Sequence, residues 1–216
     1  MNAHVVVTAL AALLLLHGRE ADARAAAQDP APAADLTLPQ LVDRCFGSSE
    51  AGRAAFAELQ QRAERDYAAV FAQWEAEPAG PRRECLDHAL QLPAVRAATV
   101  IVAGAIGKLD TIQGGVVDYH RLDAWFTTPD VVRADDEARG QLHSGFFAVV
   151  SGTSSDTWLV QQLRTSLERE VARGPRVWLF ERTHLQRGTG EQARHLEIAQ
   201  WTSLPAAAAA CIRRLP

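Results

Sequence analysis

Residues 177–201 read VWLFERTHLQRGTGEQARHLEIAQW, and this stretch decides between two kinds of fold. Val177 to Phe180 is a short apolar run, and the turn Arg187-Gly-Thr-Gly190 separates it from residues 192–201. Two such segments around a glycine-containing turn are typical of a β-hairpin. The same residues are equally compatible with two short helices. A hairpin would exclude a continuous stack of helices, whereas two helices would favour one.

The pattern elsewhere in the chain favours helices. Apolar residues recur at three- and four-residue steps over 51–74 and again over 158–171, which predicts two amphipathic helices. The β-branched run 99–103 and the segment 117–126 leave a strand open as an alternative. We therefore predict a mainly α fold in which residues 37–216 form a single helical domain. Shorter helices are expected at 83–92, 93–107, 129–142 and 205–215.

Two stretches share a pattern: a leucine-bearing helix, a short break, then an arginine followed by small apolar residues and a closing leucine. They are Leu41–Leu59, LVDRCFGSSEAGRAAFAEL, and Leu86–Leu109, LDHALQLPAVRAATVIVAGAIGKL, in which PAVRAA (93–98) is the best match. The pattern resembles HEAT-type helical repeats, with Arg53 and Arg96 at the position of the repeat arginine. Their 43-residue interval lies within the period of that class. The resemblance implies a helical solenoid, and an irregular helical bundle is the alternative.

The N-terminal residues predict export. Val5–Leu16 is an apolar run of 12 residues, which as a helix would reach about 18 Å, too short for a hydrocarbon core of roughly 30 Å. Two groups of small residues follow this run, and signal peptidase could accept either of them. The first ends at Ala23 and the second at Ala27. We expect residues 1–27 to be a signal peptide cleaved near one of these alanines, and residues 28–36 to be a flexible tether. The mature chain is then periplasmic or secreted, without stable membrane insertion.

The three cysteines, Cys45, Cys85 and Cys211, would then meet an oxidising compartment. One disulfide and one buried thiol are expected, with Cys45–Cys85 preferred because these two residues lie nearest in sequence. Three pairings are open, and three buried thiols that act as small hydrophobic residues are an equal alternative.

Charge excludes one class of partner. The net charge is -4, the pI is near 6.0, and Lys108 is the only lysine. Binding to nucleic acid requires a basic patch or stripe, which this sequence lacks. The charges are unevenly spread, since residues 155–216 carry nine arginines against six acidic residues. We therefore predict no nucleic-acid partner.

Asp118, His120 and Asp123 form the densest group of reactive side chains, and His143 is a further candidate. A histidine with a carboxylate can act as a base with its orienting group, or can supply two metal ligands. No second motif completes the group, so a solvated, salt-linked surface is the alternative interpretation. These four residues define one hypothesis, a small periplasmic hydrolase or metal-dependent enzyme.

The leading hypothesis is an exported helical module without catalytic activity that binds a protein partner, as small inhibitors and immunity proteins do. No cofactor is predicted. The five tryptophans mostly fall on apolar stripes, and one or two are expected at a binding surface. His184 and His195 flank the Gly-Thr-Gly turn, where a hairpin would let them face each other and bind metal or respond to pH.

Overall fold

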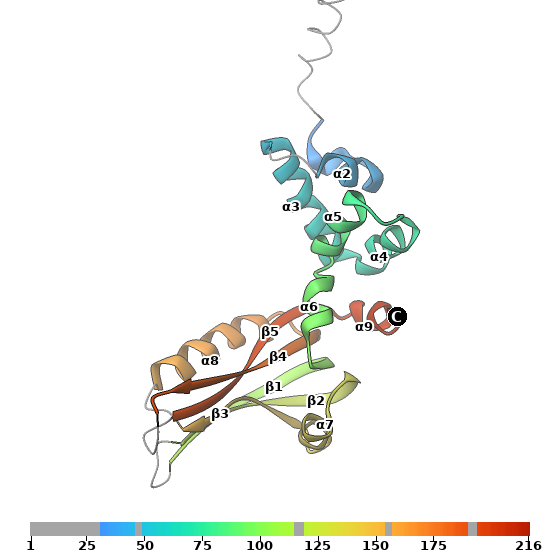
Figure 1. The fold of residues 1–216 in the computed structure, drawn as a ribbon. Coiled ribbons are helices and arrows are strands. Elements are labelled where there is room, and N and C mark those ends of the chain that lie inside the picture. The colour runs from blue at the N-terminus through green and yellow to red at the C-terminus, as the bar shows by residue number, and fades with distance from the viewer. Residues whose placement is uncertain (1–30, 46–48, 115–118, 154–156, 190–193) are drawn as a thin grey trace, which may run out of the picture. The chain divides into compact units, whose positions relative to one another are not determined.

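The computed structural model describes residues 31–45, 49–114, 119–153, 157–189 and 194–216 (Figure 1). The chain divides into residues 1–37 and a compact unit that spans Leu38–Pro216. The predicted signal peptide and the first three residues of the predicted tether lie outside the described residues. The described part of the tether contains one turn of 3-10 helix, η1 (Ala33–Asp35).

Helices make up most of the described residues between 38 and 97. They are α2 (Leu38–Arg44), α3 (Glu50–Arg65), α4 (Tyr67–Ala76), α5 (Pro81–Ala89) and α6 (Leu92–Ala97). The single helix predicted over 51–74 is therefore two helices. Asp66 separates them because it ends α3 and caps α4, where its carboxylate accepts a hydrogen bond from the backbone N–H of Ala69 at 3.1 Å.

Five antiparallel strands follow and close into a barrel in the order β1-β2-β3-β5-β4, with β4 paired back to β1 (Figure 1). The strands are β1 (Val100–Gly114), β2 (Tyr119–Arg133), β3 (Phe146–Thr153), β4 (Arg176–Arg187) and β5 (Arg194–Pro205). Three helices accompany them: α7 (Asp136–His143) after β2, α8 (Thr157–Val171) after β3, and α9 (Ala208–Ile212) after β5.

The stretch 177–201 is a hairpin. Strands β4 and β5 pair continuously from Arg176 opposite Pro205 to Arg187 opposite Arg194. The expectation of a mainly α fold, whether solenoid or helical bundle, is therefore wrong, because the helices are joined by a closed barrel of five strands. The resemblance to HEAT repeats also fails locally. Arg96 lies in the last turn of α6, and the chain continues as strand β1, so the second helix of that repeat does not exist.

The other predictions have mixed outcomes. The helix over 158–171 is confirmed as α8. The helix predicted over 93–107 stops at Ala97, because the β-branched run that follows pairs with β4, beginning with the N–H of Thr99 on the carbonyl oxygen of Phe180 at 2.9 Å. The described part of 117–126 is strand. In 129–142, β2 continues to Arg133 before α7 begins, and the closing helix is shorter than predicted.

Two apolar clusters make up the core, and the strands divide their residues between them. In β4, Trp178 and Phe180 belong to the cluster inside the barrel, whereas Val177 and Leu179 belong to the cluster formed with the helices of residues 38–97 and α9. In β1, Ile101 likewise packs with the helices, while its neighbours pack inside the barrel. Successive side chains of a strand point to opposite faces, so both faces of these strands are buried. The indole N–H of Trp178 donates to the carbonyl oxygen of Gly104 at 3.0 Å.

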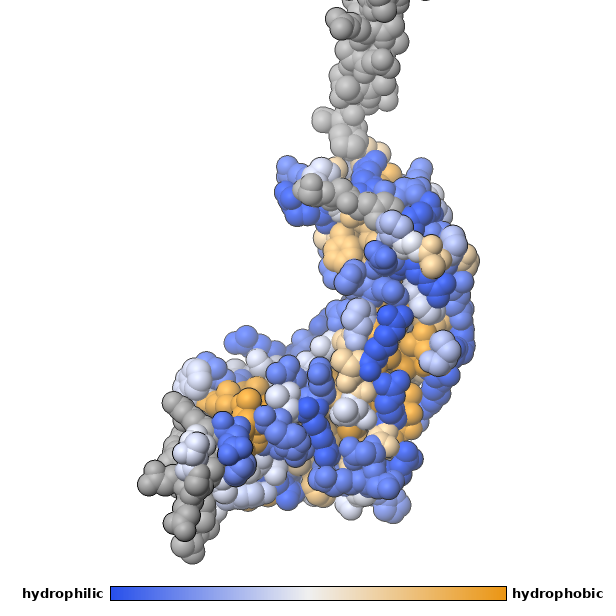
Figure 2. Space-filling model, in the orientation of Figure 1, coloured by the Kyte–Doolittle hydropathy of each residue, from blue (hydrophilic) through white to orange (hydrophobic). Residues whose placement is uncertain are grey.

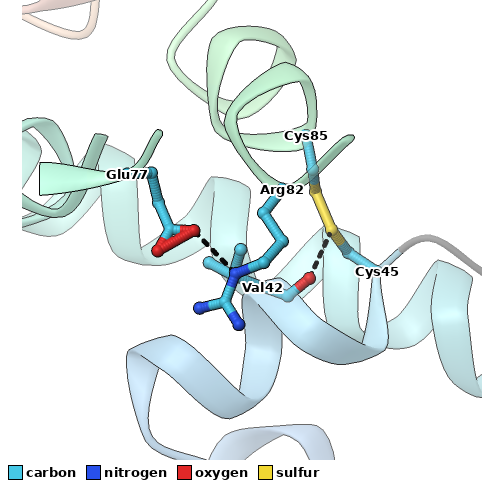
Figure 3. The surroundings of a disulfide bond; sticks show 5 residues. All are labelled: Val42, Cys45, Glu77, Arg82 and Cys85. Atoms are coloured by element: carbon cyan, nitrogen blue, oxygen red, sulfur yellow. Dashed lines mark hydrogen bonds and ion pairs between the residues drawn. A yellow bond between two sulfur atoms is a disulfide. The ribbon is translucent and has the colours of Figure 1, made fainter. Parts of the chain in front are cut away.

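A disulfide joins Cys45 to Cys85, as predicted, and ties the end of α2 to α5 (Figure 3). The sulfur of Cys45 lies 3.2 Å from the carbonyl oxygen of Val42. Beside the disulfide, the Nε of Arg82 donates to Glu77 at 2.6 Å (Figure 3). Cys211 is a free, buried thiol, and burial raises its pKa. The disulfide is compatible with an extracellular location.

None of the helices in the described ranges is long and apolar enough to span a bilayer.

Polar contacts fix the C-terminal end of α8 to the barrel. The carboxylate of Glu170 accepts a hydrogen bond from the hydroxyl of Ser203 on β5 at 2.6 Å and pairs with Arg173 at 3.2 Å. Partial burial favours the neutral form of Glu170. The Ser203 hydrogen bond and the nearby charges of Arg173 and Arg176 outweigh that effect, so the pKa of Glu170 lies below its usual value.

We expect Glu170→Gln to lower the free energy of unfolding by about 1 kcal/mol at pH 7. A depressed pKa stabilises the fold above the unfolded-state value and loses that effect as the pH falls through the folded-state value. The difference between the parent protein and the variant should therefore shrink below about pH 4, which urea titrations at several pH values would reveal. The control is Glu168→Gln, which removes an exposed pair with Arg164. A gap of constant size down to pH 2 would contradict this role for Glu170.

Candidate functional site

Strand β2 carries the residues that the sequence singles out for chemistry. Asp123 is only 1% exposed, and both of its carboxylate oxygens accept hydrogen bonds from Arg121, at 2.6 and 2.5 Å. The hydrogen bond with Asp123 is the main cause that raises the pKa of Arg121. The guanidinium also lies over the ring of Phe146, 4.9 Å from its centre. Asp123 is thus engaged by its strand neighbour, and no hydrogen bond joins it to His120.

His120 is buried on the same strand, with 5% of its surface exposed. It lies opposite Gln113 of β1 and Gly152 of β3. Its Nδ1 atom has no hydrogen-bond partner among the residues that the structure describes. A buried polar atom without a partner is uncommon and merits a functional test, but no described carboxylate orients this ring as a catalytic pair would require.

Of the other two residues in the hydrolase hypothesis, the structure describes only His143. His143 lies in the last turn of α7 with its side chain exposed, and Asp118 falls outside the described residues. Within the described ranges, no three histidine, cysteine or acidic side chains are grouped closely enough to hold a metal ion. The hydrolase hypothesis, which names Asp118, His120, Asp123 and His143, stays a prediction.

The two histidines beside the hairpin turn are not cross-strand partners. His184 lies opposite Glu197, with 3.6 Å between its Nδ1 and a carboxylate oxygen, and His195 lies opposite Gln186. Because His195 is two residues from Glu197, the histidines share a face as diagonal neighbours. The side chain of His184 is 80% exposed, which describes a solvated surface position.

The outer face of α8 is the clearest candidate for a binding surface. Val160 and Leu167 are buried in the barrel cluster, and Leu159, Leu163 and Val171 pack against it. The opposite side of the helix lines a shallow concavity of about 410 Å³. We call this surface the α8 face, and its residues are Trp158, Gln161, Gln162, Thr165, Ser166 and Arg169.

Trp158 dominates this surface because 67% of it is exposed, whereas Trp74 and Trp178 are buried. The sequence did not indicate this difference. Trp158 adjoins the apolar stripe that begins at Leu159, so spacing alone placed it in the core. The position of Trp158 around the helix axis could have indicated its exposure. Residues 159, 163, 167 and 171 form the stripe that faces the core, and Trp158 lies about 100° around the axis from Leu159.

Few of the large apolar residues in the described ranges are exposed to solvent. Hydrophilic residues cover most of the face shown in Figure 2, and apolar residues gather in a few patches. The large apolar residues with substantial exposure in the described ranges are Ile112, Trp125, Trp158 and Leu185, of which Trp158 is the most exposed. The ring of Trp125 packs against the ring of Phe146 in a tilted arrangement, with 5.3 Å between their centres.

No protein-family model, curated protein or solved structure matches this chain.

Proposed function

We propose that this protein is an exported binding module that docks a protein partner on the α8 face. The single observation that carries the proposal is the 67% exposure of Trp158 at one end of that face. Exposed tryptophan leaves a large apolar ring in water, and tryptophan is strongly enriched among the residues that dominate binding energy at interfaces. The four neighbouring glutamine, threonine and serine side chains can donate and accept hydrogen bonds without the cost of burying a charge.

The charge of the α8 face specifies the partner further. Arg169 is its one charged residue, and no described residue forms an ion pair with it. The C-terminal part of the chain is also rich in arginine relative to acidic residues. The partner surface should therefore offer an apolar pocket for the indole of Trp158 and a carboxylate opposite Arg169. Arginine binds carboxylates with two parallel hydrogen bonds, which would fix the register of the complex.

Two features support export. The Val5–Leu16 run followed by small residues has the pattern of a cleaved signal. The Cys45–Cys85 disulfide would persist in the periplasm or outside the cell, where thiols are not kept reduced.

The test is site-specific photocrosslinking in the producing cells. A crosslinking residue at Gln162, on the α8 face, should give one discrete adduct, and the additional change Trp158→Ala should abolish it. The matched control is a crosslinker at Ala72, an exposed position on α4, which should not give this adduct. The proposal is overturned if Gln162 gives no adduct, or if the adduct persists without Trp158.

With the purified partner, Trp158→Ala should weaken binding by about 30-fold or more, as expected for a residue worth at least 2 kcal/mol at an interface. The free energy of unfolding should change by less than about 0.5 kcal/mol, because the side chain is mostly in water. Calorimetric titration and urea unfolding measure the two quantities. Equal losses of stability and affinity would show a folding defect instead of a lost contact.

A further inference from the structure

A second concavity has a volume of about 400 Å³ and lies between α3, the α5–α6 turn and the C-terminal end of β5, away from the hairpin turn. It shares no lining residue with the α8 face. Its polar lining includes Gln60, Gln61, Glu64, Gln91 and Arg173, and its apolar lining includes Leu204. The volume falls in the range of small-ligand sites, and the mixture of apolar wall and a few convergent polar groups is typical of them. We call it the glutamine cleft.

The charged residues of the glutamine cleft are held in a fixed network. One carboxylate oxygen of Glu64 accepts hydrogen bonds from both Arg173 and Arg176, each at 2.6 Å. Arg176 is almost fully buried and also donates to the hydroxyl of Ser203 at 3.2 Å. The other oxygen of Glu64 has no hydrogen-bond partner among the described residues. The network therefore presents a preorganised acceptor whose position costs a ligand no further ordering.

Gln91 contributes local backbone strain to the same cleft. It has φ 55° and ψ 36°, a left-handed conformation, at the junction between the end of α5 and the start of α6. Glycine is the usual residue at this position after a helix, because a side chain there costs roughly 1–2 kcal/mol. The strained residue is exposed and lines the cleft. Strain of this kind is concentrated at functional sites, where the side chain is needed for another purpose.

The chemistry of the lining selects among ligand classes. Phosphates and other anions are disfavoured, because Glu64 faces the cleft and both of its arginine neighbours are already paired. Stacking of a sugar or a base is disfavoured, because the lining tyrosine, Tyr67, is only 1% exposed. Three glutamine carboxamides each donate and accept hydrogen bonds, which matches the alternating N–H and C=O groups of a peptide backbone.

We propose that the glutamine cleft binds a short peptide, with its backbone amides on Gln60, Gln61 and Gln91 and an N–H or α-ammonium group on the open oxygen of Glu64. Peptide binding in the glutamine cleft does not depend on a partner at the α8 face, and the reverse also holds. Sequence preference would be low, because the recognised groups belong to the backbone of the ligand.

The probe is trialanine, titrated to about 10 mM against the full chain with the glutamine side-chain amides observed by nitrogen-15 NMR. The amide signals of Gln60, Gln61 and Gln91 should shift with saturation, while that of Gln162 on the α8 face should not. Inorganic phosphate and N-acetylglucosamine are the comparison ligands. If they move these signals and trialanine does not, or if no ligand moves them, the proposal is overturned.

Gln91→Gly separates binding from folding. Glycine relieves the left-handed strain, so we expect Tm to rise by about 2 °C, while the affinity for trialanine falls about tenfold with the loss of one carboxamide. Gln60→Ala should weaken binding without a gain in stability. Gln162→Ala is the matched control and should change neither quantity. Unchanged affinity in both cleft variants would overturn the assignment, whatever happens to Tm.

Discussion

Gly152→Ala is expected to destabilise the protein by about 4 kcal/mol or more, which places it among the severe point substitutions. A methyl group on Gly152 would lie 2.2 Å from the carbonyl oxygen of His195 and 3.0 Å from the Cα atom of Leu196. Both obstacles are backbone of β5, which pairs with β3 over three residue pairs among the described residues, Val150 to Gly152. The methyl group can therefore be accommodated only if β3 and β5 separate. Urea unfolding followed by circular dichroism measures the effect.

The control is Gly80→Ala, since Gly80 has φ 150° against 143° for Gly152 but nothing lies within 4 Å of an added methyl group. Its cost should be about 1 kcal/mol, the backbone penalty alone. The difference between the two losses in free energy of unfolding measures the effect of the close contact between β3 and β5. Equal stability of the two would mean that β3 and β5 are not paired at this position.

Loss of the disulfide has the second large effect. The bond closes a segment of 40 residues, and the loop-entropy relation gives about 4 kcal/mol for a loop of that length. The double variant Cys45→Ser with Cys85→Ser should unfold at correspondingly lower urea, and dithiothreitol should shift the parent protein towards the same midpoint. The helices of residues 38–97 should lose protection from hydrogen exchange first, because the bond ties α2 to α5.

Cys211→Ala is the matched control for the redox experiment. It removes the buried thiol and leaves the disulfide, so its unfolding midpoint should still respond to dithiothreitol. A response that disappears in this variant, or a peptide map that places Cys211 in the disulfide, would contradict the pairing.

The sequence predicted local features well and the barrel poorly, for a reason visible in β4. Val177, Trp178, Leu179 and Phe180 are all apolar because alternate residues pack into different clusters. A strand buried on both faces loses the alternation of apolar and polar residues that identifies strands, so the pattern also fits a helix. The run from Val100 to Val102 in β1 was ambiguous for the same reason.

Strand β2 could not be recognised from the sequence, because its pairing with β1 is irregular. The sequence pattern predicts that a helix starts at Pro129, yet this residue lies within β2. It follows Thr128, which has φ 48°, and the register of β2 against β1 shifts there. Proline lacks a backbone N–H and is tolerated in a strand at such irregularities. Only the partner strand reveals the irregularity, and that partner is not visible in a local window of sequence.

Some residues of the candidate sites could be predicted from the sequence, and others could not. Residue type alone was enough to select His120 and Asp123, but not the partner of Asp123, because Arg121 reaches it only in an extended strand. The Cys45–Cys85 pair followed from proximity in sequence. The glutamine cleft could not be predicted, since its lining comes from segments more than 100 residues apart, such as Glu64 and Arg173.

Because β1 pairs with β4, which is made much later, the edge of β1 is unpaired for part of the synthesis of the chain. The backbone N–H and the hydroxyl of Thr99 both donate to the carbonyl oxygen of Phe180, which is made only after a further 81 residues. At 5 to 20 residues per second, the edge of β1 stays without this partner for about 4 to 16 seconds. That edge begins Val-Ile-Val-Ala, a sequence well suited to pairing with another chain. Fragments that end before Arg176 should therefore aggregate, whereas the complete chain covers this edge with its own β4.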